Sequence, residues 1–245
     1  MKTTVLYFSP TGGVEHVAQF VAGEVKADAL DITVFDYDLT YGEGEKVFFC
    51  FPVYGGRIPA PLYKRLSGIR GEGANAVLVA VYGNRAVDDA LIELSDLVRR
   101  KGFRVVGGAE MIAPHSLNKR IAADRPDESD KAKMRDFLAK LMAKDTFGVV
   151  AMPGSHDYKK YDGLPFHPIS GKECSGCGTC AQECPTGAID SGDPMKPDAK
   201  KCISCMRCVS VCPFEVRHLP KAMQLTAAAS LRAMCAGRKE PKFYI

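Results

Sequence analysis

The sequence lacks tryptophan, and none of its uncharged apolar runs approaches the length of about eighteen residues that a membrane span requires. Its start, Met-Lys-Thr-Thr-Val-Leu-Tyr-Phe, leads into an apolar strand and does not resemble a signal peptide. Compositional bias is also absent, because 46% of the 245 residues are hydrophobic and 25% are charged. We therefore expect a cytoplasmic, globular protein without a membrane span and long enough for two domains.

A strong charge of one sign is missing from most of the chain. Residues 1–170 carry 22 basic and 22 acidic side chains, so the formal net charge of +4 comes from residues 171–245, which carry 11 and 7. The basic clusters Arg99-Arg100-Lys101 and Lys159-Lys160 are not interleaved with the aromatic residues on which bases stack. We interpret them as solvated surfaces and expect no nucleic-acid binding.

What the sequence does contain is a doubled cysteine pattern that accounts for eight of its ten cysteines. In each copy, three cysteines are spaced C-x2-C-x2-C, and a fourth follows after three residues and precedes a proline. Three thiolates on a short turn can occupy three corners of an iron–sulfur cube, whereas the fourth ligates the other cube. The predicted pairing is therefore crossed. One 4Fe-4S cluster is expected on Cys174, Cys177, Cys180 and Cys212, and the second on Cys202, Cys205, Cys208 and Cys184.

Zinc binding and disulfides are the alternatives, since paired C-x2-C units also occur in zinc sites. Zinc requires neither the third cysteine of each run nor the trailing Cys-Pro pair. Disulfides are disfavoured because a cytoplasmic chain stays in a reducing compartment.

The segment from Gly171 to Leu219 resembles the bacterial two-cluster ferredoxins in this motif and its spacing. The resemblance implies a small α+β domain of hairpins and turns, and the repeat implies pseudo-twofold symmetry. Such a short segment buries too little apolar surface to fold alone. Bonds to the clusters are therefore expected to supply much of its stability.

The preceding part of the chain alternates between predicted strands and helices. Strands are expected at residues 3–8, 32–35, 47–51, 76–81 and 103–111, and helices at 13–26, 59–67, 87–101 and 127–144. Five strands with intervening helices predict an α/β fold with a doubly wound five-stranded parallel sheet. A ligand is then expected at the carboxyl ends of the strands.

Three glycine-containing turns follow predicted strands and are the candidate cofactor site. The first offers hydroxyls and the N–H groups of a helix N-terminus to an anion, and it lacks the lysine of a nucleotide P-loop. The other two each carry a tyrosine that can stack on a ring. A capped tight turn is the alternative for the first loop, and a half-buried packing residue for either tyrosine. The candidates are Ser9, Pro10, Thr11, Gly12, Gly13 and Val14; Pro52, Val53, Tyr54, Gly55 and Gly56; and Tyr82, Gly83, Asn84 and Arg85.

These three loops resemble those of the flavodoxins, in which the first holds the phosphate of FMN and the other two enclose the isoalloxazine ring. The family pattern is S/T-x-T-G-x-T, and this chain has Val14 in place of the last threonine, so that one hydroxyl contact is lost. The resemblance implies a flavodoxin-like, FMN-binding domain. No NAD(P) site is visible, since Gly71-x-Gly73 precedes a predicted strand instead of following one.

Other reactive side chains are expected to play no part in the site. His115 is interpreted as a solvent-facing loop residue, with a place near the edge of the flavin as the alternative. Cys50 is interpreted as a small buried residue of the third predicted strand. Cys235 falls in the predicted C-terminal helix.

The predicted organisation has four parts. Residues 1–148 form the flavodoxin-like domain, 149–170 a linker, 171–219 the two-cluster domain, and 220–245 a C-terminal helix and tail. The linker is rich in glycine, proline and tyrosine and is expected to pack on the surface. The C-terminal helix, with little polar face, is expected to dock on the flavodoxin-like domain, and docking on a partner is the alternative.

The whole chain resembles the flavodoxin–ferredoxin fusion proteins of anaerobic bacteria and archaea. The resemblance implies low-potential electron transfer between two 4Fe-4S clusters and FMN, and onward to redox partner proteins such as ferredoxins or oxidoreductases. A carrier without a small-molecule substrate is the preferred interpretation. The alternatives are an FMN-dependent reductase of a quinone or other small acceptor, and a dedicated redox activator or sensor of one partner enzyme. A substrate-sized pocket at the flavin would favour the reductase; the sequence does not indicate the oligomeric state.

Overall fold

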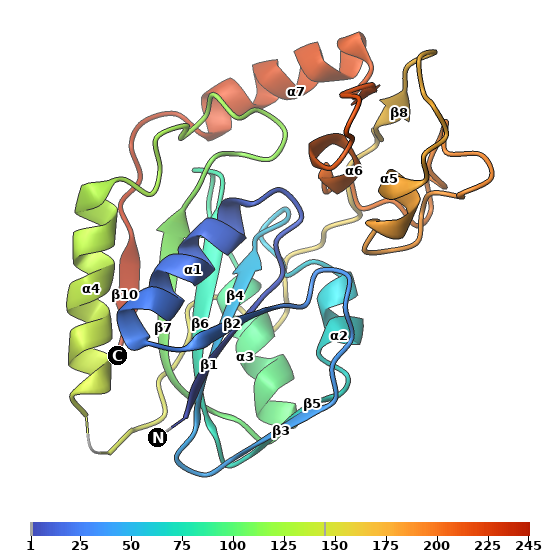
Figure 1. The fold of residues 1–245 in the computed structure, drawn as a ribbon. Helices are drawn as coiled ribbons and strands as arrows, with labels where there is room; N and C mark the ends of the chain where they lie inside the picture. Colours follow the sequence, from blue (N-terminus) through green and yellow to red (C-terminus); the bar gives the residue numbers. More distant parts are fainter. Residues whose placement is uncertain (1, 145) are drawn as a thin grey trace.

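Five parallel strands form most of the central sheet in the computed structural model, which describes residues 2–144 and 146–245 (Figure 1). They are β1 (Thr3–Tyr7), β2 (Asp28–Asp31), β4 (Lys46–Pro52), β6 (Asn75–Tyr82) and β7 (Arg104–Ile112). The sheet order is β10-β7-β6-β4-β1-β2. Numbered along the chain, the parallel strands stand in the order 2-1-3-4-5, which is the flavodoxin-like doubly wound arrangement. The predicted fold class is confirmed.

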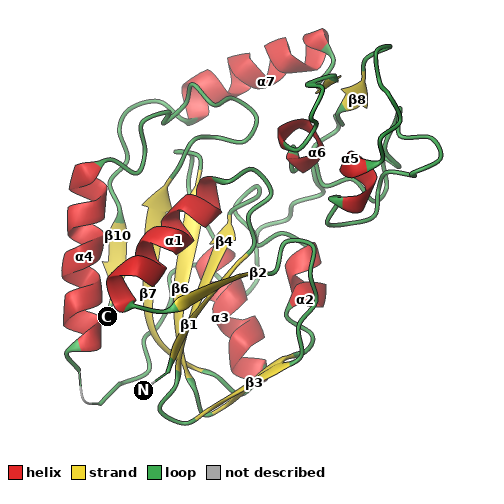
Figure 2. Cartoon of the chain, viewed as in Figure 1, coloured by secondary structure: helices red, strands yellow, loops and turns green. Residues whose placement is uncertain are grey.

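Helices cover both faces of this sheet (Figures 1 and 2). One face carries α1 (Gly13–Val25) and α4 (Glu128–Met142), and the other carries α2 (Pro61–Arg65) and α3 (Ala90–Arg100). Because both faces are covered, β4 and β6 are buried along their whole length. A small parallel pair, β3 (Leu39–Gly42) and β5 (Ile69–Glu72), lies near the end of the sheet where β1 begins.

The second strand begins and ends four residues earlier than the sequence predicts. Thr33 N donates to Asp31 Oδ1 at 2.7 Å, which turns the chain immediately after β2. Thr33 Oγ1 in turn accepts a hydrogen bond from Ser9 N at 2.8 Å. The predicted strand at residues 32–35 is therefore wrong, since a polar edge strand ends where these side chains turn the backbone.

A sixth strand corrects the prediction of a five-stranded sheet. The C-terminal strand β10 (Lys242–Tyr244) pairs antiparallel with β7, placing Phe243 opposite Ala109. Tyr244 Oη donates to Glu110 Oε1 at 2.6 Å. Three residues at the end of the chain carry no periodic pattern, so that only the pairing with a distant strand defines β10.

The small domain contains two matching halves. Its short antiparallel ladder consists of β8 (Ile169–Ser170) and β9 (Arg217–His218), and its short helices are α5 (Thr179–Gln182) and α6 (Arg207–Ser210). Each short helix carries the third cysteine of one run, Cys180 or Cys208. Figure 1 shows this domain beyond the carboxyl ends of the parallel strands. Within the part of the chain that the structure describes, no helix is long and apolar enough to span a bilayer.

The chain between the two domains packs along the large domain, as expected from its aromatic residues. Val150 N donates to the carbonyl oxygen of Val105 at 2.9 Å. Tyr158 Oη donates to Asp96 of α3 at 2.5 Å. These contacts fix the approach of the small domain to the large one.

The C-terminal helix α7 (Lys221–Met234) buries less than the sequence suggests. Its buried side chains are Ala227 and Leu231, whereas Leu225 is 74% exposed. The expected docking of an apolar helix face is therefore limited. The tail beyond α7 makes the stronger attachment, through β10 and the hydrogen bonds of Asn84 described below.

Candidate redox sites

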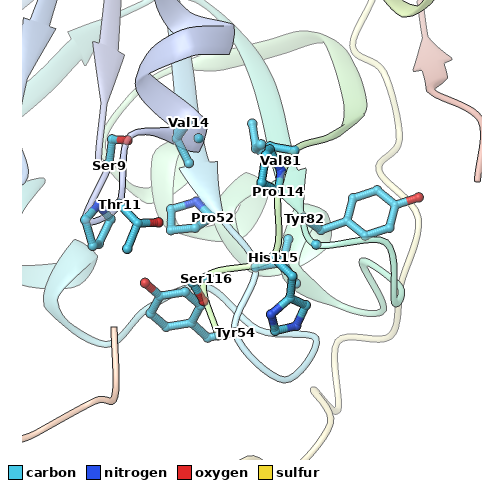
Figure 3. Close-up of a pocket in the computed structure, with 15 residues that line it drawn as sticks. Ser9, Thr11, Val14, Pro52, Tyr54, Val81, Tyr82, Pro114, His115 and Ser116 are labelled. Carbon is cyan, nitrogen blue, oxygen red and sulfur yellow. The ribbon is translucent and has the colours of Figure 1, made fainter. Parts of the chain in front are cut away.

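A cleft opens where β1, β4, β6 and β7 end, and the loops after these four strands form its walls (Figure 3). It encloses about 50 Å³, so that a ligand larger than a phosphate would lie mostly across its mouth. Its lining residues are Ser9, Pro10, Thr11, Gly13, Val14, Pro52, Val53, Tyr54, Val81, Tyr82, Gly83, Ala113, Pro114, His115 and Ser116.

The β1–α1 turn presents free donors to this cleft. Gly12 adopts φ 87°, a left-handed conformation that lets the chain enter α1 sharply. Among the described residues, the N–H groups of residues 11–14 have no protein acceptor. Ser9 Oγ accepts from Glu15 N at 2.9 Å, which leaves the Ser9 hydroxyl hydrogen available. Free N–H groups at a helix N-terminus are suited to an anion such as a phosphate.

Val14, which replaces a threonine of the flavodoxin pattern, has a packing role. It is 4% exposed and belongs to the apolar core between α1 and the sheet. The lost hydroxyl is thus exchanged for buried apolar surface.

The β4 loop places Tyr54 at one wall of the cleft and keeps its two glycines outside it. The peptide groups of Tyr54 and Arg57 pair at 2.9 and 3.1 Å, closing a tight turn in which Gly55 and Gly56 have positive φ. A Cβ on Gly55 would overlap the ring of Tyr161, which therefore packs directly on this turn. Burial raises the pKa of the Tyr54 hydroxyl well above its ordinary value, with smaller contributions from Cys205 and Tyr161.

The β6 end corrects the predicted role of Tyr82. Its side chain is 7% exposed and belongs to the apolar core, and Figure 3 shows its ring turned away from the cleft. Burial raises the pKa of Tyr82 to about 12, and Glu110 adds to this effect. Alternation along the strand puts Tyr82 on the same face as the core residues Leu78 and Ala80. Tyr82 therefore borders the cleft through its backbone and not through its ring.

Asn84 and Arg85 also serve other contacts. Asn84 Nδ2 donates to the carbonyl oxygens of Cys235 and Gly237 at 2.7 and 2.8 Å, so it holds the C-terminal tail. Arg85 forms an ion pair with Asp88. Neither residue lines the cleft, and their place in the cofactor site stays a prediction.

The loop after β7 also lines the cleft, although the sequence analysis considered a place for His115 near the flavin only as the alternative. His115 packs against Gly83, where a Cβ would overlap the imidazole ring. Its Nδ1 accepts from Leu117 N at 3.2 Å. Burial lowers the pKa of His115, and Arg85 contributes to the same shift. The rule that ligands bind at the carboxyl ends of strands applies equally to β7 and could have identified this loop.

The structure brings the cysteines of the small domain together in two groups. The first, called the Cys174 group, consists of Cys174, Cys177, Cys180 and Cys212, which line a common cavity. In the second, called the Cys202 group, Cys184 comes close enough to raise the pKa values of Cys202, Cys205 and Cys208. Each group combines three cysteines of one run with the fourth of the other, as the crossed prediction requires.

Two thiols of the Cys202 group, those of Cys205 and Cys208, are buried. Burial raises the thiol pKa of Cys205 to about 12 and that of Cys208 to about 11. Thiolate ligands at these positions therefore depend on the positive charge of the iron.

Cys50 and Cys235 lie outside both groups. Cys50 is 2% exposed within the core of β4, and burial raises its thiol pKa. Cys235 is 6% exposed at the end of α7. Both are buried free thiols.

Comparison with known proteins identifies the small domain. The 4Fe-4S dicluster domain family matches residues 173–216. The chain is 37% identical over 59 residues to a ferredoxin-like protein of the nif region of Sinorhizobium fredii, covering 21% of this chain and 92% of that protein. It is 43% identical over 51 residues to ferredoxin-1 of Chlorobaculum tepidum, covering 18% and 82%. It is also 37% identical over 65 residues to the Escherichia coli oxidoreductase AegA, covering 24% of this chain but only 10% of that protein.

Solved structures similar to the large domain include flavoproteins. A flavodoxin from the Archaea is 15% identical with a TM-score of 0.40, covering 58% of this chain and 99% of that one. A flavodoxin of Streptococcus pneumoniae is 18% identical, again with a TM-score of 0.40 and the same coverage. The strand order, independently of these similarities, establishes the fold class.

Proposed function

Since the chain belongs, through residues 173–216, to the family of two-cluster 4Fe-4S ferredoxins, we propose that it is an electron carrier joining two clusters to FMN. The Cys174 group and the Cys202 group would each hold one cluster. FMN, when bound, accepts one or two electrons, whereas an all-cysteine cube carries one at low potential. Redox proteins would be the partners on either side.

The observation that carries this proposal is the position of the small domain over the cleft. Arg207, between two cysteines of the Cys202 group, donates Nη1 to the carbonyl oxygen of Ser9 at 3.2 Å. A cluster ligand segment therefore touches the β1–α1 turn itself. This proximity favours electron transfer within one molecule.

The cleft residues fit FMN at its phosphate end. The free N–H groups of residues 11–14 and the Ser9 hydroxyl would bind the phosphate. Tyr54 and the loop of Pro114 and His115 would border the ring, which would lie across the mouth of the cleft. Flavodoxin-like proteins bind FMN at this switch point of the sheet.

Cofactor content tests the proposal. After anaerobic reconstitution, each chain should hold about eight iron atoms, eight sulfides and one FMN, because two cubes and one phosphate site are available. Elemental analysis and release of the flavin by denaturation would measure this. Iron levelling off near half this content, stoichiometric zinc in native protein, or failure to bind FMN would contradict the proposal.

A cavity beside the cleft supports a second candidate function, the reduction of a small acceptor at FMN. It measures about 740 Å³, within the range of small-molecule sites, and Ser116 lines both it and the cleft. Lys119 and Arg120 also line it, and within the described residues neither forms an ion pair. An acceptor with a negative group would suit these side chains.

Steady-state reduction of naphthoquinones with and without a sulfonate group distinguishes the two candidates. A reductase should show saturation with the sulfonated quinone, and K119A/R120A should raise its KM with little change in kcat. A carrier should show no saturation and no effect of the double substitution. K64A, an exposed lysine on α2, is the matched control.

A further inference from the structure

The two cysteine groups differ in their contacts with the large domain. Arg207 Nε donates to Glu183 Oε2 at 3.0 Å, while its Nη1 reaches the Ser9 carbonyl. Glu183 directly precedes Cys184, and Arg207 lies two residues after Cys205. One guanidinium thus joins the β1–α1 turn to both chain segments that supply the Cys202 group.

A second hydrogen bond attaches the same side of the small domain. Arg65 Nη2, from α2, donates to the carbonyl oxygen of Pro185 at 3.2 Å. Pro185 follows Cys184 directly, and Arg65 is 7% exposed. The contact is therefore buried and again lies at the Cys202 group.

Tyr54 lies between the cleft and the Cys202 group. It lines the cleft, and it also lines a cavity of about 410 Å³ together with Cys202 and Ile203. A single aromatic side chain therefore borders both proposed redox sites.

The Cys174 group lies outside these hydrogen bonds, and of its four cysteines Cys212 lines the cavity of about 740 Å³ that Ser116 also borders. Cys177 is exposed, and Phe214, which lines the cavity of this group, is 55% exposed. Among the described residues, no hydrogen bond connects residues 171–182 or 212–216 with residues 2–144. Figure 1 shows α5 farther than α6 from the central sheet.

We infer that the two clusters occupy successive positions in the electron path, with the Cys202 group holding the inner cluster and the Cys174 group the outer one. This inference rests on the proposed function. The inner cluster exchanges electrons with FMN past Tyr54, and the outer cluster exchanges them with external one-electron donors. Arg207 is a positioning residue that holds the inner cluster at the cleft.

The electron balance follows from this order. One electron from a reduced external donor, such as dithionite, reduces the outer cluster, which is oxidised again as the inner cluster is reduced. The inner cluster is oxidised in turn as FMN is reduced. Two such passages, with protons taken from water, complete the reduction of FMN by two electrons.

Accessibility of each cluster to a soluble relaxation agent tests the order. C205A should retain only the outer cluster, and C177A only the inner one. Each reduced variant would be examined by electron paramagnetic resonance with and without a gadolinium chelate. FMN fluorescence would be recorded separately, on the oxidised variants. Gadolinium should accelerate the relaxation of the outer cluster more strongly, and FMN fluorescence should remain quenched only where the inner cluster is retained.

The outcomes separate this inference from the proposed function. In protein that carries iron and FMN, one contradictory result is that gadolinium acts equally on the two clusters, and another is that it acts more strongly on the inner one. Either result would contradict the proposed order of the clusters. Absence of FMN or iron from the wild-type chain would contradict the proposed function itself.

Substitution of Arg207 tests the positioning role in a chain that keeps both clusters. R207A should slow flavin reduction by the clusters severalfold or more, because the hydrogen bond that holds the inner cluster segment at the Ser9 carbonyl is lost. R207K should recover part of the rate, and R232A, an exposed residue of α7, should retain it. Iron content and cluster spectra serve as the readouts of correct assembly. An unchanged rate in R207A with a full complement of iron would show that Arg207 does not position the cluster.

Discussion

At the scale of single residues, the candidate sites are defined by side chains that are close in space but far apart in the sequence. The Cys202 group combines Cys184 with three cysteines of the second run. Burial raises the pKa of Cys205 to about 12, so the protein alone would keep this thiol protonated. Binding of iron must supply the charge that stabilises the thiolate.

Single cysteine substitutions should distinguish ligands from bystanders. C184A should damage the cluster of the Cys202 group, and C212A that of the Cys174 group, because each removes the fourth ligand of a crossed set. C50A and C235A, at buried free thiols, should leave the iron content unchanged and serve as controls. Iron analysis and electron paramagnetic resonance would measure this. Selective loss of the Cys174-group cluster in C184A would refute the crossed arrangement.

His115 should make the stability of the protein depend on pH. Burial and Arg85 lower its pKa in the folded state, so the unfolded chain binds more protons below about pH 6.5. The free energy of unfolding should therefore fall as the pH drops from about 7 to about 5, and it should fall less in H115Q. H16Q, at an exposed position of α1, is the control. Urea unfolding at each pH would test this, and equal pH slopes in H115Q and the wild type would contradict it.

At the scale of secondary-structure elements, the end of the chain belongs to the large domain even though the cysteine-rich domain intervenes. β10 completes the central sheet beside β7, and α7 spans the distance back from the small domain (Figure 1). Asn84 accepts from Lys239 N at 3.3 Å in addition to its two donated hydrogen bonds. The tail is therefore attached at two points, and the small domain is held at both of its ends.

Loss of the Asn84 side chain should release this attachment. N84A removes three hydrogen bonds to the tail and should lower the free energy of unfolding by about 1–3 kcal/mol. Amide hydrogen exchange in β10 should accelerate, while the exchange of β6 outside its last residues stays slow. R232A should leave both unchanged. Undiminished protection of the Phe243 amide in N84A would show that the β-ladder alone holds the tail.

At the scale of the whole molecule, the contacts of Arg65 and Arg207 hold the two domains against each other, as the proposed electron path requires. The linker adds further contacts, such as the donation from Arg57 Nη1 to the carbonyl oxygen of Lys159 at 2.8 Å. A loosely tethered domain would instead sample many orientations. The arrangement favours transfer inside the molecule over collision between molecules.

Stopped-flow kinetics should show this directly. With dithionite in excess, the step in which the clusters reduce FMN should proceed at a rate that is independent of protein concentration. NADPH and NADH should not reduce the protein, since its sequence shows no site for them. Measurement over about a tenfold range of protein concentration would test the first point, because a reaction between molecules would become faster in proportion to the concentration. Mixing the protein with NADPH or NADH alone would test the second. A rate proportional to protein concentration would mean that the domains act as independent carriers.

The local sequence was sufficient for those features whose residue spacing or periodicity is compatible with a single arrangement of the chain. The repeated cysteine spacing predicted both groups, because three thiolates on one turn leave the fourth to the other cube. The alternation of apolar strands and amphipathic helices predicted the doubly wound sheet, since such strands must be covered on both faces. The β1–α1 turn was likewise predictable, because glycine and a helix N-terminus define an anion site locally.

Tertiary structure decided what depends on which face a side chain occupies and which distant segment covers it. Tyr82 faces the core because its strand has a fixed alternation, whereas Tyr54 lies in a turn and reaches both the cleft and the Cys202 group. The burial of His115 beside Gly83, the pairing of β10 and the contact of Arg207 with Ser9 all join residues remote in sequence. Such contacts form only when distant segments of the chain pack together, and no local pattern encodes them.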